Sequence, residues 1–155
     1  MISKVKKIEY SEVAYNELPD NVKQLIDKAK EATKTSYAPY SKFHVGAALE
    51  TDGRHIVCGS NQENVAYPSG LCAERTAVFA CGAQYPKEAV VALAIAAETE
   101  GNFLAQPIVP CAACLQVLLE TERRGGKAID FYLYGTEVIY YIKGVGSFLP
   151  FSFDM

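Results

Sequence analysis

Three cysteines and one glutamate in this chain have the spacing of a metal site that keeps one position open. The chain reads Cys72-Ala73-Glu74-Arg75 and, farther along, Pro110-Cys111-Ala112-Ala113-Cys114. Thiolate sulfur is a preferred zinc ligand, and two thiols three residues apart lie on the same side of one helical turn. A structural zinc site is closed by four protein ligands, whereas a catalytic site leaves one position for water. Three thiols beside a carboxylate therefore predict a hydrolytic Zn²⁺ site in which Glu74 moves protons.

The elements that must position these thiols are two predicted helices. One begins at Cys72, and the other begins near Cys111. The N–H groups and the positive dipole end of a first helical turn favour thiolates over thiols. Three thiolates and Zn²⁺ sum to one negative charge, which makes the metal a weaker acid than three imidazoles would. We expect Arg75 and the two helix dipoles to offset this charge.

Other interpretations of the same residues remain open at this point. A Cys-x-x-Cys pair also occurs in redox enzymes, although such sites need neither a third cysteine nor a nearby glutamate. A closed structural zinc site would need a fourth ligand, for which the chain offers His44, His55 and Cys58. Otherwise Cys58 and Cys81 are expected to be small buried hydrophobic side chains, and the two histidines to be ordinary residues of a hairpin.

Length and composition indicate a single folded domain, residues 1–155. Half of the 155 residues are hydrophobic and 21% are charged, as in ordinary globular proteins. The net charge of −3 and the pI near 5.4 disfavour a polynucleotide partner. We expect no membrane association, because the longest apolar run, 89–97, is too short to span a bilayer.

The N-terminus and the cysteine count predict a cytoplasmic protein. Residues 1–7 contain lysines but are not followed by the apolar segment of a signal peptide. Five cysteines are an odd number, and in a reducing compartment clustered thiols indicate metal binding or catalysis more than disulfides.

The hydrophobic pattern predicts an α/β fold. Helices are expected over 18–34, over 72–81 and from 111 to the glycines at 125–126, and strands over 44–51, 55–60, 90–97, 129–134 and 137–142. The turn at Asp52-Gly53 predicts a hairpin of the first two strands. This order of elements predicts a three-layer α-β-α sandwich around a mixed sheet of about five strands.

The motifs resemble those of the small, homotetrameric, zinc-dependent cytidine deaminases. Zinc deaminases pair a His- or Cys-x-Glu with Pro-Cys-x-x-Cys, and their glutamate is not a zinc ligand. The resemblance extends to three further strings, which are Tyr40-Ser41-Lys42-Phe43-His44-Val45-Gly46-Ala47-Ala48, Asn61-Gln62-Glu63-Asn64-Val65-Ala66-Tyr67 and Phe148-Leu149-Pro150. It covers about residues 25 to 153.

The resemblance implies a cytidine deaminase-like fold and a homotetramer that shares its active sites between subunits. It implies hydrolysis of cytidine, deoxycytidine or both to the uracil nucleoside and ammonia, as in pyrimidine salvage. It also implies a role for each matching residue: Cys72, Cys111 and Cys114 hold zinc, Glu74 is catalytic, Phe43 packs on the pyrimidine, Asn61 and Glu63 bind the ribose hydroxyls, the backbone of Ala73 contacts the base, and Phe153 covers the site of a neighbouring subunit.

Two residues depart from the family pattern. The family usually reads Pro-Cys-Gly-x-Cys-Arg-Gln, whereas this chain has Ala112 for the glycine and Leu115 for the arginine and keeps Gln116. Alanine suits a helix start if its φ is negative. The missing arginine affects the charge around the metal. Asn61 and Glu63 indicate a ribose but do not fix the base, so a deaminase of another aminopyrimidine nucleoside, such as an antibiotic, is an alternative function. Leu115 leaves a non-catalytic zinc-binding protein as a second alternative.

Overall fold

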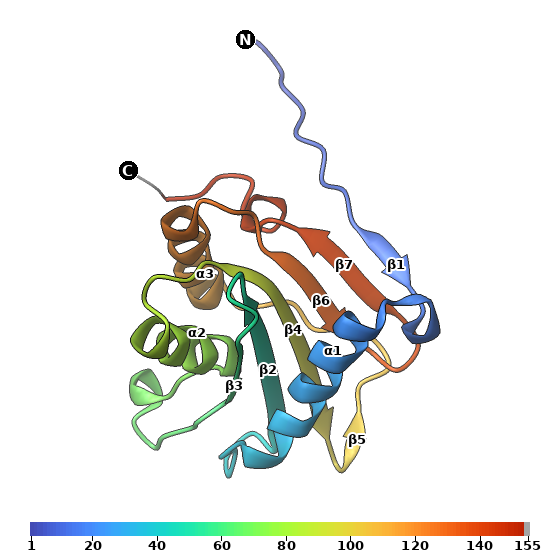
Figure 1. The fold of residues 1–155 in the computed structure, drawn as a ribbon, viewed down its shortest axis with the longest axis vertical. Coiled ribbons are helices and arrows are strands. Elements are labelled where there is room, and N and C mark those ends of the chain that lie inside the picture. The colour runs from blue at the N-terminus through green and yellow to red at the C-terminus, as the bar shows by residue number, and fades with distance from the viewer. Residues whose placement is uncertain (154–155) are drawn as a thin grey trace.

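The computed structural model describes residues 1–153, in which helices cover both faces of one mixed sheet (Figure 1). The helices are α1 (Asp20–Ala32), α2 (Ala73–Gln84) and α3 (Ala112–Gly125). The strands are β1 (Ser11–Val13), β2 (Phe43–Thr51), β3 (Ile56–Ser60), β4 (Val90–Thr99), β5 (Asn102–Phe103), β6 (Asp130–Tyr134) and β7 (Ile139–Lys143). Each helix and strand predicted from the sequence is present, and no end is shifted by more than three residues.

The sheet has more strands than the sequence predicted. Its order is β1-β7-β6-β4-β2-β3, and β5 pairs with β4 beside this path. The pair β4–β6 is parallel, and the other pairs are antiparallel. The prediction of about five strands is wrong because it missed β1 and β5, which have three and two residues and are too short to show an alternating pattern.

Alternate residues of the central strands face the two helical layers. In β4, Leu93 and Ile95 belong to the cluster that α2 and α3 cover, while Ala94 and Ala96 belong to the cluster of α1. Figure 1 shows α1 on one side of the sheet and α2 with α3 on the other. The predicted three-layer α-β-α sandwich is therefore confirmed, and both faces of its central strands are buried.

The first turns of α2 and α3 begin where the sequence predicted. Cys72 and Cys111 are the residues that immediately precede these helices, and both have extended backbone. Pro110 lies just before the second of them, and α3 ends at Gly126, whose φ of 64° is in the left-handed region that favours glycine. Both cysteines thus lie at the positive end of a helix dipole.

Gly59 allows α2 to lie directly against β3. A Cβ atom at this position would come within 2.4 Å of the backbone nitrogen of Ala77 and 2.6 Å of the carbonyl oxygen of Ala73. No side chain fits there without moving the helix. The backbone of β3 therefore fixes the position of the first turn of α2, which carries Cys72 and Glu74.

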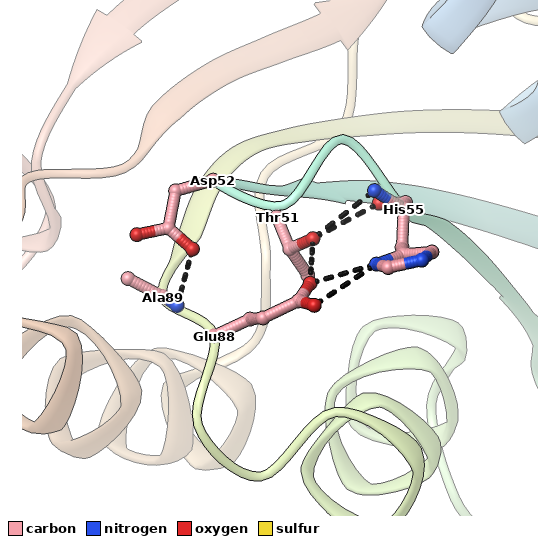
Figure 2. A network of polar contacts seen from close by, with 5 residues as sticks. All are labelled: Thr51, Asp52, His55, Glu88 and Ala89. Atoms are coloured by element: carbon pink, nitrogen blue, oxygen red, sulfur yellow. Dashed lines mark hydrogen bonds and ion pairs between the residues drawn. The ribbon is translucent and has the colours of Figure 1, made fainter.

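A network of polar contacts fastens the β2–β3 turn to the segment before β4 (Figure 2). The Glu88 carboxylate accepts a hydrogen bond from the Thr51 hydroxyl and lies 2.9 Å from His55 Nδ1. Asp52 Oδ1 accepts a hydrogen bond from the Ala89 N–H at 3.1 Å. These contacts close the end of the hairpin, where the predicted turn is found.

Among residues 1–153, no helix is both long enough and apolar enough to cross a bilayer.

Candidate metal centre and adjoining cavity

The sulfur atoms of Cys72, Cys111 and Cys114 form one cluster. The Sγ atoms of Cys72 and Cys111 are 3.8 Å apart, those of Cys111 and Cys114 are 3.4 Å apart, and all three lie within 4.8 Å of one another. Tetrahedral zinc with Zn–S bonds of about 2.3 Å separates its sulfur ligands by about 3.8 Å. The cluster therefore has the dimensions and the donor atoms that zinc requires.

The charge of the cluster also favours a cation. Hydrogen bonds from Cys114, Arg75 and Cys111 lower the pKa of the Cys72 thiol to about 5. The pKa of the Cys114 thiol is instead raised well above its usual range, by its hydrogen bond to Cys72 and by burial. The cluster therefore loses one thiol proton easily, whereas the loss of a second proton is strongly unfavourable in free energy. A divalent cation between the sulfurs would remove that cost.

Arg75 contacts the cluster as predicted. Its Nη2 atom lies 3.6 Å from the Sγ of Cys72. Its Nε atom is buried and has no hydrogen-bond partner among residues 1–153. The interactions with Cys72 and Cys114 raise the pKa of Arg75 above its usual range, so the guanidinium stays charged beside the thiolates.

Glu74 is a buried carboxyl group next to the metal centre. It lies in the first turn of α2, only 4% exposed, two residues after Cys72. Burial raises its pKa to about 7, and the charge of Cys72 acts in the same direction. Desolvation favours the neutral form of a carboxyl group, so Glu74 can both take up and release a proton near neutral pH.

A cavity of about 490 Å³ adjoins the cluster. Its walls include four of the residues selected from the sequence, which are Asn61, Glu63, Cys72 and Arg75. The other lining residues are Tyr40, Ser41, Gln62, Asn64, Tyr67, Gly70 and Leu71. The volume is within the range of small-molecule sites, and the cavity opens onto the metal centre through Cys72.

Asn61 and Glu63 connect the cavity wall to the start of β2. The Asn61 amide donates to the Phe43 carbonyl at 2.8 Å and accepts from the Val45 N–H at 2.8 Å. The Glu63 carboxylate accepts hydrogen bonds from the Ser41 hydroxyl and from the N–H of Tyr40 at 2.9 Å. Both side chains are therefore held by the protein at the edge of the cavity.

The remaining predicted site residues lie outside the lining of this cavity. Phe43 is half-buried at the start of β2 and packs against the core cluster of α2 and α3. Ala73 is fully buried in the first turn of α2. The side chain of Phe153 is 76% exposed, and its carbonyl accepts a hydrogen bond from Gln116.

Several residues of the cavity were not predicted as site residues from the sequence. Tyr40, Ser41 and Tyr67 were part of the strings that carried the resemblance, but nothing in their types singled them out. The rings of Tyr40 and Tyr67 meet edge to face, with their centroids 6.0 Å apart. Their place in the strings that resemble the family was the available signal.

The side chains offered for a closed structural site are not part of the cluster. His44 forms a hydrogen bond with Ser36, and His55 is stacked on Tyr85 with ring centroids 4.1 Å apart. Within residues 1–153, the three thiols are the only group of three or more His, Cys, Asp or Glu side chains close enough together to hold a metal ion. Cys81 is buried as predicted.

The prediction that Cys58 is buried is wrong, because its thiol is exposed. Cys58 is part of the edge strand β3, and it lines an open depression with Lys28 and Glu31 of α1. Its side of the strand is therefore incompletely covered by the helix.

The two departures from the family pattern fit the structure locally. Ala112 is the first residue of α3 and is not among the residues with positive φ, so the condition for an alanine there is met. Leu115 is 7% exposed and belongs to the core cluster of α2 and α3. Leucine at this position contributes to packing and adds no charge beside Cys114.

Known proteins resemble most of this chain. The family model described as the cytidine and deoxycytidylate deaminase zinc-binding region matches residues 19–125. The chain is 45% identical over 100 residues to a cytidine deaminase of Sporosarcina psychrophila. This match covers 64% of this chain and 69% of the relative. The chain is 42% identical over 96 residues to the cytidine deaminase of Halalkalibacterium halodurans, which covers 62% of this chain and 68% of the relative.

Solved structures share the fold. The crystal structure of cytidine deaminase from Burkholderia pseudomallei matches with a TM-score of 0.71 and 38% identity, over 88% of this chain and 100% of that one. Cytidine deaminase from Mycobacterium tuberculosis matches with a TM-score of 0.67 and 33% identity, over 88% and 100%. The chain therefore belongs to the family of cytidine and deoxycytidylate deaminases, and its three clustered thiols lie in the zinc-binding region of that family.

Proposed function

We propose that this chain hydrolyses the exocyclic amine of cytidine, deoxycytidine or both, with Glu74 as the proton carrier. The observation that carries the proposal is the buried carboxyl group beside three thiols at a nucleoside-sized cavity. The relatives that match this chain are named cytidine deaminases. This chain is likewise a cytidine deaminase, and thus a hydrolase.

Cys72, Cys111 and Cys114 are the residues that would hold zinc. Bound zinc would supply a Lewis acid that lowers the pKa of water toward neutrality. The two helix N-termini and the Arg75 guanidinium reduce the charge of the thiolates. Their combined effect is to make the thiolate cluster less electron-rich than it would be alone.

Glu74 moves the protons in this proposal. It takes a proton from the attacking water and donates one to N3 of cytosine, so that C4 becomes electrophilic. Water oxygen bonds to C4, and Glu74 then takes the remaining proton of that oxygen and delivers it to the departing amine as the C4=O bond forms. The C4–N bond breaks, and the products are uridine and ammonia. One buried carboxyl group serves as base and then as acid, which general acid–base catalysis allows.

The cavity wall selects a nucleoside in this proposal. Asn61 and Glu63 contact the ribose hydroxyls, the Phe43 ring packs on the pyrimidine, and the Ala73 backbone contacts the base. In support, Asn61 and Glu63 line the same cavity as Cys72 and Arg75 of the metal motif. An ionised carboxylate accepts hydrogen bonds only, which suits a ribose hydroxyl as the donor.

Assembly and location complete the proposal. We place Phe153 over the active site of a neighbouring subunit in a homotetramer, supported by the exposure of its ring and of Phe151. Light scattering after size-exclusion chromatography checks the assembly, and a monomer would contradict it. We place the enzyme in the cytoplasm, because three free thiols survive as metal ligands in a reducing compartment.

The function is tested with the zinc-loaded protein and a panel of substrates. Cytidine, deoxycytidine, cytosine and adenosine are followed by ultraviolet absorbance, and ammonia is measured separately. We expect one ammonia per uridine formed from the cytosine nucleosides and little from free cytosine. Turnover of none of these substrates by protein with one zinc per chain would favour a non-catalytic zinc protein.

A further inference from the structure

The carboxylate of Glu63 is held by three donors of one short segment. The Ser41 hydroxyl donates to Oε1, while the N–H of Tyr40 at 2.9 Å and the N–H of Ser41 at 3.3 Å donate to Oε2. Ser41 is the only side chain among the three donors. The orientation of a predicted ribose contact thus depends on a residue that has no assigned role.

The same hydroxyl is connected to Phe43. The Phe43 N–H donates to Ser41 Oγ at 3.1 Å, so the hydroxyl accepts one hydrogen bond and donates another. Lys42, between them, has a φ of 57°, a conformation that non-glycine residues adopt when their surroundings stabilise it. Its N–H donates to the Ala38 carbonyl, and its carbonyl accepts from Thr99. The turn around Ser41 is therefore fixed at both ends.

The contacts of Asn61 with β2 are independent of Ser41. They go to the carbonyl of Phe43 and to the N–H of Val45. Removal of the Ser41 hydroxyl would leave both in place. It would free the Glu63 carboxylate from one donor and would leave the Phe43 N–H without its acceptor.

The hydrogen bond from Ser41 also favours the charged form of Glu63. The hydrogen bond from Ser41 is the first cause that lowers the pKa of Glu63, and the two backbone N–H groups and the charge of His44 act in the same direction. Hydrogen bonds to the charged form of a carboxyl group stabilise that form. Oε2 accepts two of these hydrogen bonds and Oε1 accepts one, so Oε1 keeps a lone pair for a donor in the cavity.

We propose that Ser41 is a positioning residue for nucleoside binding, which fixes the Glu63 carboxylate toward the cavity and holds it in register with Phe43. The inference rests on the proposed function for the identity of the ligand as a nucleoside. The hydroxyl touches neither the metal ligands nor Glu74 in the contacts of the structure. Ser41 therefore acts on the binding of the ribose and leaves the proton transfers to Glu74.

Whether Ser41 holds the Glu63 carboxylate is tested without measuring activity. The carboxyl carbons of glutamate are labelled with ¹³C, the Glu63 signal is assigned by its loss in Glu63→Ala, and its pKa is measured by titration. We expect Ser41→Ala to raise this pKa and Ser41→Thr, which keeps the hydroxyl, to preserve it. Ser11→Ala is the matched control, because Ser11 is exposed in β1 at the opposite edge of the sheet from β3. A Glu63 pKa in Ser41→Ala equal to that of the wild type would overturn the inference.

The effect on binding is tested by steady-state kinetics with cytidine. We expect Ser41→Ala to raise KM about tenfold and to change kcat less than about twofold, as for the loss of a binding interaction that the ground state and the transition state share. Ser41→Thr should restore KM. In a Glu63→Ala background Ser41→Ala should have no further effect, because Ser41 acts through Glu63.

The outcomes separate this inference from the proposed function. An active Ser41→Ala enzyme with unchanged KM contradicts the role of Ser41. The role is also contradicted if Ser41→Ala raises KM as much in the Glu63→Ala background as in the wild type. A wild-type protein that has zinc and no turnover contradicts the proposed function instead. In that case the ¹³C titration still decides whether Ser41 holds Glu63.

Discussion

The Sγ atom of Cys72 lies 3.8 Å from the Sγ atom of Cys111, although the two residues are 39 positions apart in the chain. Each is the residue immediately before a helix, and α2 and α3 cover the same face of the sheet. The metal centre thus depends on how two helices begin, and each helix supplies its dipole together with its thiol.

Cys111→Ser should lose zinc. A serine hydroxyl has nearly the same shape as a thiol but is a far weaker zinc ligand, and the two remaining thiols make an incomplete site. Elemental analysis of the purified protein should show well under one zinc per chain. Cys58→Ser is the matched control, because Cys58 is an exposed thiol outside the cluster. Full zinc content in Cys111→Ser would mean that Cys111 is no ligand.

Arg75→Gln should weaken both zinc binding and activity. The substitution removes the charge that lies 3.6 Å from the Cys72 sulfur. Loss of a residue that orients or balances metal ligands typically costs about tenfold to a hundredfold in affinity or activity. Competition with a chelator and the pH–rate profile measure the effect. If neither changes, Arg75 does not balance the charge of the thiolates.

Gly59→Ala should disturb the metal centre through the backbone. The added methyl group would meet the backbone of Ala73 and Ala77 in the first turn of α2. Overpacking of this kind costs about 1–3 kcal/mol, and here it also shifts the segment that carries Cys72 and Glu74. Urea denaturation and zinc titration should show a lower unfolding midpoint and weaker zinc binding. Gly146→Ala is the control, since a methyl group there meets nothing within 4 Å, and equal behaviour of the two variants would refute this account.

Glu88→Gln should reduce stability at neutral pH and have a smaller effect in acid. Hydrogen bonds from Thr51 and His55 lower the pKa of Glu88 in the folded protein, whereas Asp52 acts in the opposite direction. A lowered folded-state pKa contributes stability above the unfolded pKa, about 4.3 for glutamate, and that stability is lost as the pH falls through the folded value. Thermal unfolding between pH 7 and pH 3 should show the difference from the wild type shrinking toward acid. A difference that is constant across this range would exclude a charge effect.

The spacing of the thiols and the apolar periodicity were sufficient to predict the central architecture. Cys111-x-x-Cys114 can bring two sulfurs together only within one turn, and the run from Val90 onward has the apolar continuity of a strand covered on both faces. The layers of helices follow from these local patterns. The prediction that Cys72 and Cys111 lie close together rested on zinc-site chemistry alone, because no local sequence pattern connects the two segments.

Other features depend on tertiary context that a sequence pattern does not contain. The strands β1 and β5 exist because β7 and β4 offer them partners. Cys58 is exposed because β3 is the last strand of the sheet order, and a pattern of apolar residues does not reveal which strand lies at an edge. The role of Ser41 depends on the meeting of two loops and on side-chain rotamers.

The central claim, that Glu74 carries protons for hydrolysis at the three-thiol site, is tested most directly with Glu74→Gln. Turnover of cytidine is measured together with zinc content and far-ultraviolet circular dichroism, for the variant and for the wild type. The amide keeps the shape of the side chain but cannot transfer a proton, so we expect zinc and fold to be unchanged and turnover to fall at least about a thousandfold. A variant that retains zinc and more than about a tenth of the wild-type turnover would contradict the claim.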